Sequence, residues 1–167
     1  MKRTALLAPM LILIVSSVPA VHGLPGWKSG SFAFALVGYE VEGRLVNATV
    51  YPDGNVLSVM SVDDVLQTPF GPASIIGRGE WSGAVNGTGM SGLIEDVSGA
   101  IRVCAPACGD TNFVGYGVWV GAFSPQGLEA EGTFQGSIIF TSSPFAQIPL
   151  DRLIPVNGTW TLSGFQA

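Results

Sequence analysis

Two stretches of the chain share a frame in which glycine recurs every second residue around a tryptophan. The frame G-x-G-x-W-x-G-A occurs at 77–84 and again at 115–122. Alternate residues of a β-strand point to the same side, so these glycines would share one face with the indoles of Trp81 and Trp119. Glycine within a strand is destabilising, and it usually marks a bend or the close approach of another group. We therefore expect each tryptophan ring to lie over neighbouring backbone, an arrangement that suits the tapered inside of a small barrel.

The rest of the chain predicts an all-β fold. Short segments rich in Val, Ile, Phe, Tyr, Trp and Thr are separated by turn signals such as PDGN at 52–55, VNGTG at 85–89 and SPQG at 124–127. Asn-Gly between two such segments is a strong signal for a tight hairpin. The pattern predicts an antiparallel meander of about eight or nine strands, which forms either a small barrel or a sandwich.

Three local features add detail to this prediction. The alternation of apolar residues changes phase beside Gly38, which indicates a β-bulge. In SVDDVLQT at 61–68, Ser61 can cap a short helical turn that carries Asp63 and Asp64 in its first turn. A second short helical turn is expected in PLDRLIP at 149–155.

The first residues have the layout of a secretory signal peptide. Lys2 and Arg3 precede an apolar run from residue 5 to residue 15, and small residues follow it. We place the cleavage after Gly23, with Ala20 as a second choice, which leaves 24–167 as a single all-β domain. An uncleaved anchor is the alternative, because residues 4–21 could nearly span a bilayer. Such an anchor would be the membrane contact of this chain.

The charge of the mature domain excludes one class of partner. After residue 23, five scattered basic residues stand against twelve acidic ones, a net charge of −7. Nucleic-acid binding needs clustered Lys and Arg, so no nucleic-acid partner is expected. The single histidine, His22, would leave with the signal peptide. A mature domain without histidine excludes the familiar His-dependent catalytic mechanisms and His-ligated metal sites. We expect no catalytic residue, no metal and no cofactor.

Cys104 and Cys108 in CAPAC are the only cysteines in the sequence. A pair of cysteines in an exported chain favours a disulfide, and the three residues between them could turn the chain enough to bring the sulfurs together. Metal binding through C-x3-C is the alternative, but it would need His or Met ligands close by.

Acidic residues recur in pairs: Glu40/Glu42, Asp63/Asp64, Glu95/Asp96 and Glu129/Glu131. Two carboxylates two residues apart on one strand face lie about 6–7 Å from each other, which suits glycoside hydrolysis or calcium binding. The same spacing is typical of any solvated strand face. A glycan hydrolase that uses such a pair is the least favoured function.

Three asparagines lie in N-x-S/T sequons and are candidates for N-glycosylation: Asn47, Asn86 and Asn157. The sequence Asn-Gly at the second and third sites also favours a tight turn, which gives both of these asparagines a rival explanation.

Short G-x-W elements, among them GTW at 158–160, resemble a tripeptide that lies in a barrel strand of lipocalins and avidins. The resemblance covers three residues at each place. Here GTW belongs to the last expected strand, whereas lipocalins carry theirs in the first, so no family follows from it.

The segment 113–123 carries no charge on either expected face. Antiparallel strands usually show water one polar face, so this strand is covered by a loop or meets another molecule. The leading hypothesis is an exported, non-catalytic domain, secreted or at the cell surface, that contacts itself or another surface component. Its alternative is a β-barrel that binds a small apolar ligand between Trp81 and Trp119.

Overall fold

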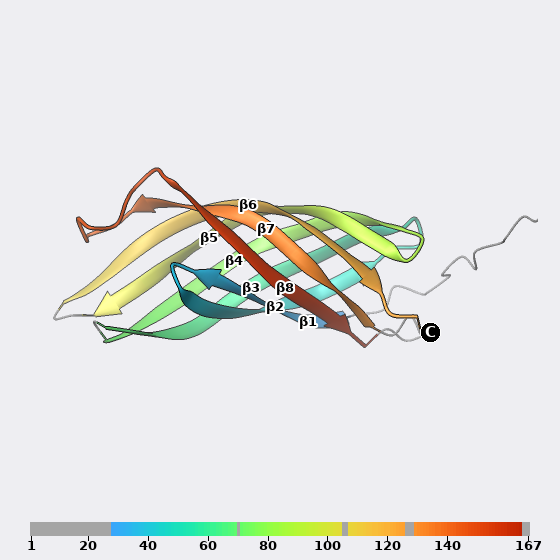
Figure 1. Ribbon diagram of the computed structural model, residues 1–167, viewed down its shortest axis with the longest axis horizontal. Helices are drawn as coiled ribbons and strands as arrows, with labels where there is room; N and C mark the ends of the chain where they lie inside the picture. Colours follow the sequence, from blue (N-terminus) through green and yellow to red (C-terminus); the bar gives the residue numbers. More distant parts are fainter. Residues whose placement is uncertain (1–27, 70, 105–106, 126–128, 165–167) are drawn as a thin grey trace, which may run out of the picture.

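The computed structural model describes residues 28–69, 71–104, 107–125 and 129–164, and these form one closed β-barrel (Figure 1). Eight antiparallel strands follow one another around the barrel in chain order, which confirms the all-β meander and selects the barrel over the sandwich. The strands are β1 (Lys28–Leu36), β2 (Tyr39–Val50), β3 (Asn55–Thr68), β4 (Gly71–Asn86), β5 (Gly89–Cys104), β6 (Cys108–Phe123), β7 (Glu129–Ser142) and β8 (Leu153–Ser163).

The first and last strands close the barrel. Six residue pairs join β1 to β8, from Ser29–Ser163 to Phe34–Gly158. The described strands thus pair on both sides, and the barrel has no free strand edge of the kind that recruits another strand. The β2–β3 and β4–β5 connections lie at the right-hand end in Figure 1, where β1 begins and β6 and β8 end.

The phase change beside Gly38 has another cause than the predicted bulge. Val37 and Gly38 form the two-residue connection between β1 and β2, with φ of 50° and 84°. Positive φ at both central residues is typical of the type I′ turn, whose twist matches that of the flanking strands. The bulge prediction at this position is therefore wrong: the alternation changes because the chain turns back.

Both predicted helical turns are wrong as well. Residues 61–68 continue β3, where Val62 and Leu66 are buried and fourteen residue pairs join the strand to β4. The register along a whole neighbouring strand outweighs one capping side chain. Leu150 and Asp151 form a turn rather than a helical turn, and Leu153 already begins β8. The described part of the chain contains no helix, hence none long enough to cross a membrane.

Aromatic rings and paired glycines fill the inside of the barrel, as the repeated frame predicts. Gly83 of β4 lies directly opposite Gly92 of β5, and Gly92 in turn lies opposite Trp119 of β6. We call such a set of paired residues on neighbouring strands a row. A Cβ on either glycine would collide with the Trp119 ring and with backbone of the neighbouring strand. The Trp119 Nε1–H donates to the carbonyl oxygen of Ser82 at 3.1 Å.

The same arrangement recurs two strands further along. Gly121 and Gly132 form a pair between β6 and β7, and the ring of Trp160 lies over both. Its Nε1–H donates to the carbonyl oxygen of Val120 at 3.3 Å. Each indole therefore rests on a glycine pair and donates to the carbonyl of the residue before the first glycine.

Trp81 departs from this pattern. Trp81 of β4 lies opposite Ser58 of β3, where the other two rows have a glycine. The second glycine position is taken by Ala48 of β2, next to a bulge in that strand. The carbonyl equivalent to that of Ser82 or Val120 belongs to Asn47, whose φ of 56° turns the backbone out of the regular ladder. Trp81 Nε1 is buried and has no hydrogen-bond partner among the described residues. The bulge accounts for this missing bond.

Candidate functional site

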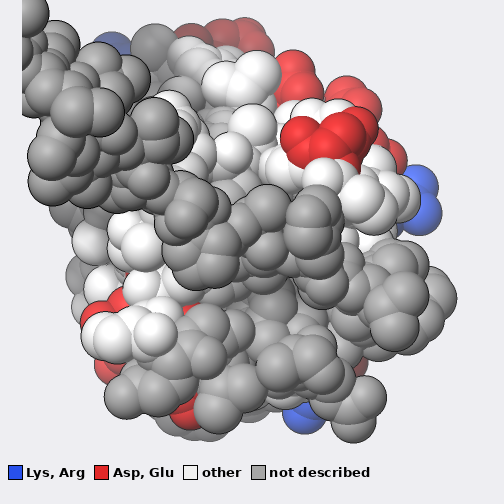
Figure 2. Space-filling model, turned by 90° about the vertical axis from the view of Figure 1, so that its right-hand side faces the viewer, with Lys and Arg blue, Asp and Glu red and all other residues white. Residues whose placement is uncertain are grey.

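The outer surface of the barrel divides into two halves by charge. The outward faces of β2 to β5, here called the charged half, carry these strand residues: Glu40, Glu42, Arg44, Asp63, Arg78, Glu80, Glu95, Asp96 and Arg102. The uncharged half comprises residues 29–36, 112–123, 132–142 and 153–163 of β1, β6, β7 and β8, which include no charged residue. In the end view of Figure 2, acidic side chains gather in separate patches between uncharged ones.

A ridge of apolar side chains runs along β6 in the uncharged half. This β6 ridge consists of Val114, Tyr116, Val118 and Val120, which are 41–54% exposed. We expected this strand either to be covered by a loop or to contact another molecule. No loop among the described residues packs over it, so the first explanation does not apply to that part of the chain. Leu93 of β5 lies beside Val118 and is also exposed.

Beside the ridge, the surface of β7 is hollowed along its length. Three hollows of about 600, 470 and 1080 Å³ follow one another along β7. The first extends past β6 to β5, where Leu93 and Glu95 line it. The first and second share Val118, Gln135 and Asn157. The second and third share Val120, Thr133 and Thr159. We call this continuous depression from Ser137 to Glu131 the β7 trough.

The glycines inside the barrel explain the trough outside it. Gly117 lies opposite Gly136, and Gly121 lies opposite Gly132, so β6 and β7 twice face inward without a side chain. A Cβ on Gly117 would come within 2.7 Å of the carbonyl oxygen of Gln135. Without inward side chains the two strands can bend toward the barrel axis, and the outer surface sinks with them.

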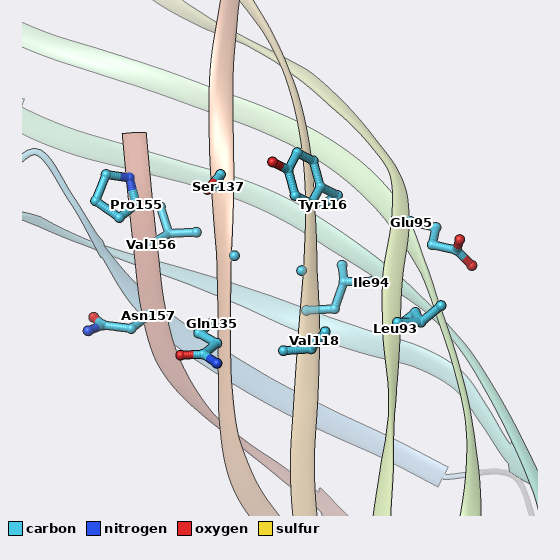
Figure 3. A pocket seen from close by; sticks show the side chains of 12 residues that line it. Leu93, Ile94, Glu95, Tyr116, Val118, Gln135, Ser137, Pro155, Val156 and Asn157 are labelled. Atoms are coloured by element: carbon cyan, nitrogen blue, oxygen red, sulfur yellow. The ribbon is translucent and has the colours of Figure 1, made fainter. Parts of the chain in front are cut away.

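The two walls of the trough differ in chemistry (Figure 3). On the β6 side lie Tyr116 and Val118, while Gln135 and Asn157 on β7 and β8 present primary amides. These two amides stem from residues directly opposite each other in the β7–β8 register. The next pair along the trough is Thr133 and Thr159. One wall is therefore apolar, and the floor and far wall donate and accept hydrogen bonds.

The candidate ligand residues Trp81 and Trp119 lie in the barrel core. Their rings stack with centroids 5.6 Å apart, and both side chains are buried. An apolar interior cavity of about 40 Å³ lies nearby, lined by Met60, Phe113 and other residues but by neither indole. Small-molecule sites usually measure about 300–1,000 Å³. Ligand binding between these tryptophans stays a prediction, and it would require the aromatic core to open.

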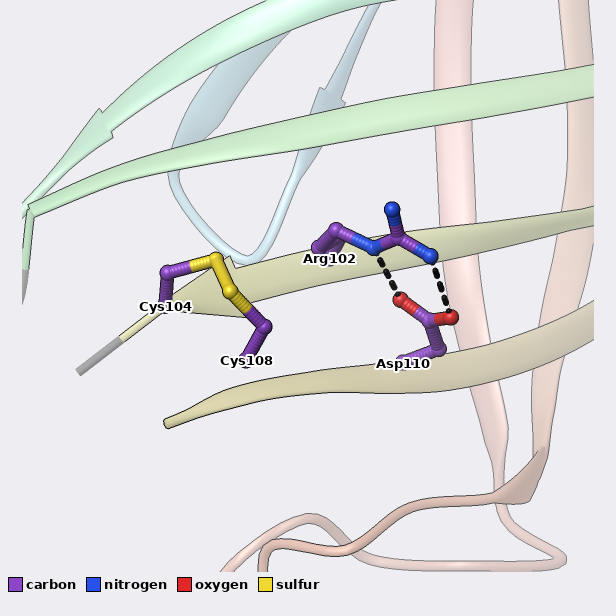
Figure 4. The surroundings of a disulfide bond; sticks show 4 residues. All are labelled: Arg102, Cys104, Cys108 and Asp110. Atoms are coloured by element: carbon purple, nitrogen blue, oxygen red, sulfur yellow. Dashed lines mark hydrogen bonds and ion pairs between the residues drawn. A yellow bond between two sulfur atoms is a disulfide. The ribbon is translucent and has the colours of Figure 1, made fainter. Parts of the chain in front are cut away.

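The disulfide prediction is confirmed: Cys104 and Cys108 are bonded and face each other at the end of the β5–β6 hairpin (Figure 4). Two residues further along each strand, Arg102 and Asp110 form a bidentate ion pair, with N–O distances of 2.7 and 2.8 Å. The hydrogen bond from Arg102 lowers the pKa of the Asp110 carboxyl below its usual range. Both side chains are exposed, so the pair adds little stability at neutral pH.

The sequon asparagines are all exposed, as glycosylation would require. Asn86 ends β4 at the predicted tight turn, and Asn47 lies at the β2 bulge. Asn157 lies within β8 rather than at a turn, so its Asn-Gly sequence does not mark a hairpin. Use of these three sites stays a prediction.

The paired carboxylates project outward except that of Asp64, which shares the strand face of buried Val62. It accepts hydrogen bonds from the backbone N–H groups of Glu42 and Val65 at 3.0 and 2.7 Å. Glu40 and Glu42 share an exposed strand face, as do Glu129 and Glu131. Within the described ranges, no cluster of three or more His, Cys, Asp or Glu could hold a metal ion. Hydrolysis by such a pair stays the least favoured interpretation.

The fold and surface together define a small up-and-down barrel with a filled aromatic core and two unlike outer halves. Comparison of the chain with protein-family models, curated proteins and solved structures found no match. The functional argument therefore depends on the chain's own geometry.

Proposed function

We propose that this protein is an exported, non-catalytic domain that acts by surface contact, through self-assembly or adhesion at the cell surface or outside the cell. The observation that carries this proposal is the β6 ridge, which exposes four apolar side chains on a strand segment without charged residues. An exposed apolar patch on a soluble domain usually marks an interaction site.

The charge distribution supports the choice of face. With twelve acidic and five basic residues after residue 23, two copies of the domain repel each other electrostatically. The uncharged half is where a second surface can approach without bringing like charges together. Because the described strands are all paired on both sides, contact must use side chains rather than an added strand.

The test compares two substitutions of similarly exposed residues. Val118 of the ridge is 42% exposed, and Leu57 on the charged half is 47% exposed. The neighbours directly opposite Leu57 are Thr49 and Ser82, so a glutamate there faces no carboxylate across either strand pair. We expect Val118→Glu to abolish assembly of the 24–167 domain in sedimentation velocity, or its retention on the envelope of producing cells, while Leu57→Glu changes neither. Equal behaviour of the two variants in both assays would overturn the proposal.

A further inference from the structure

The β7 trough has the chemistry of a binding site for an extended, amphipathic chain. Its seven-residue span from Ser137 to Glu131 along β7 is about 20 Å long at the usual rise of a strand. Tyr116 and Val118 supply an apolar wall, and the amides of Gln135 and Asn157 supply hydrogen-bonding groups beside it. These four side chains are uncharged, and the carboxylate of Glu95 lines the same hollow on the β5 side. A ligand that matches them has apolar patches and many neutral polar groups.

Several ligand classes fit this surface poorly. A peptide that binds as an added strand gains most of its affinity from backbone groups of an open strand edge, and the described barrel has none. An alkyl chain would leave the amides of Gln135 and Asn157 without partners where it covered them, which costs binding energy. An acidic polymer would meet Glu129 and Glu131 at one end of the trough and a domain of negative net charge.

We propose that the β7 trough binds an uncharged polysaccharide chain. The inference deepens the proposed function, on which it rests, by naming the partner for adhesion. A pyranose ring has an apolar face that can stack on the exposed ring of Tyr116, while its hydroxyl groups exchange hydrogen bonds with Gln135 and Asn157. The pair Thr133 and Thr159 offers the same function to the next sugar along the trough.

The experiment is affinity electrophoresis of the native, secreted protein in gels that contain one polysaccharide each. The neutral panel is β-glucan, xyloglucan, mannan and dextran, and alginate is the acidic comparison. We expect retardation by at least one neutral polymer and none by alginate. Tyr116→Ala should weaken that binding about tenfold through loss of the stacking surface. Asn157→Ala and Gln135→Ala should each weaken it about fivefold, the value of one neutral hydrogen bond.

The matched control is Gln67→Ala, which removes an exposed amide from β3 on the charged half. It should leave the retardation unchanged. Lack of retardation in every neutral gel would overturn the inference, and so would binding that the trough variants and Gln67→Ala affect equally. A glycan found on Asn157 by peptide mass mapping would also overturn it, because that glycan would itself fill the trough.

Sedimentation velocity distinguishes failure of the polysaccharide proposal from failure of the proposed function. If Val118→Glu loses assembly but Leu57→Glu does not, and no neutral polysaccharide binds, contact through the uncharged half stands and its partner is a second copy or a protein. If Gln135→Ala and Asn157→Ala disrupt assembly without polysaccharide present, the trough's occupant is a second copy of the chain, and the inference is wrong.

Discussion

The charged and uncharged halves of the barrel differ outside but not inside. The row Gly83, Gly92 and Trp119 begins on β4 in the charged half and ends on β6 in the uncharged half. The rings of Trp119 and Trp160 meet edge to face at 5.5 Å within the same core that holds Trp81. One aromatic interior thus serves both halves. Because packing inside does not require different surfaces outside, the shared core does not explain the charge asymmetry.

The largest expected effect tests whether the interior is equivalent in the two halves. Gly92→Ala and Gly132→Ala each place a Cβ against backbone of the paired strand and against a tryptophan ring. Since backbone cannot move aside as a flexible side chain can, each change should cost about 3 kcal/mol in free energy of unfolding. Urea titration followed by tryptophan fluorescence measures the loss. The outward neighbours Ser91→Ala and Thr133→Ala serve as controls and should change it little.

A large loss at one glycine and a negligible loss at the other would break the comparison. It would mean that the two halves do not share one rigid interior, and that one of them can bend outward to admit the added methyl group.

A smaller effect sharpens the comparison at the tryptophans. Trp119→Phe removes a hydrogen bond to the carbonyl of Ser82, whereas Trp81→Phe removes an N–H that has no partner among the described residues. Both changes lose similar ring volume. We therefore expect Trp119→Phe to be the more destabilising by about 1 kcal/mol, the net value of one neutral hydrogen bond. Equal losses in parallel urea titrations would show that Trp81 makes a hydrogen bond of its own, for example to water.

The smallest effect concerns the ion pair where the two halves meet at β5 and β6. The folded-state pKa of Asp110 is lowered, so its stabilising contribution is present above the usual carboxyl pKa and is lost as pH falls through the lowered value. Asp110→Asn should lower the Tm slightly at neutral pH and low salt. The difference from wild type should vanish at 1 M salt and in strong acid. A difference that survives both conditions would show that Asp110 stabilises the hairpin by other means than its charge.

Much of the fold could be predicted from local signals. The Asn-Gly signal at 86–87 locates the β4–β5 hairpin but not its register. The turn residues are Gly87 and Thr88, which pairs Gly83 with Gly92, whereas a turn one residue earlier would pair Gly83 with Met90. The disulfide could be predicted because a three-residue connection brings two cysteines together. The hairpin and the disulfide both depend on short separations along the chain, where turn chemistry is a local signal.

Other features depend on register between distant residues, which the sequence does not display. The bulge at Glu95 and Asp96 shifts the β4–β5 register, so that Gly77 faces Gly99. The helical turn expected at 61–68 was wrong because it was inferred from a local capping signal. Pairing with the distant residues of β4 decides the structure of this segment instead. The trough was missed for a similar reason: it arises from glycines on one face and is visible on the other. Its one available signal was the absence of charge from 132–142 and 153–163.

The pairing of β1 with β8 has a consequence for how this protein reaches its folded state. Ser31 and Thr161, whose hydroxyl groups hydrogen-bond across this closure at 3.1 Å, are 130 residues apart in the chain. Closing so long a loop is entropically costly, and topologies dominated by such contacts fold slowly. Until the C-terminal strand joins, β1 and β7 are open strand edges that can pair with other chains. The last eleven residues of the barrel, Leu153–Ser163, therefore protect a nascent molecule from aggregation as much as they complete its core.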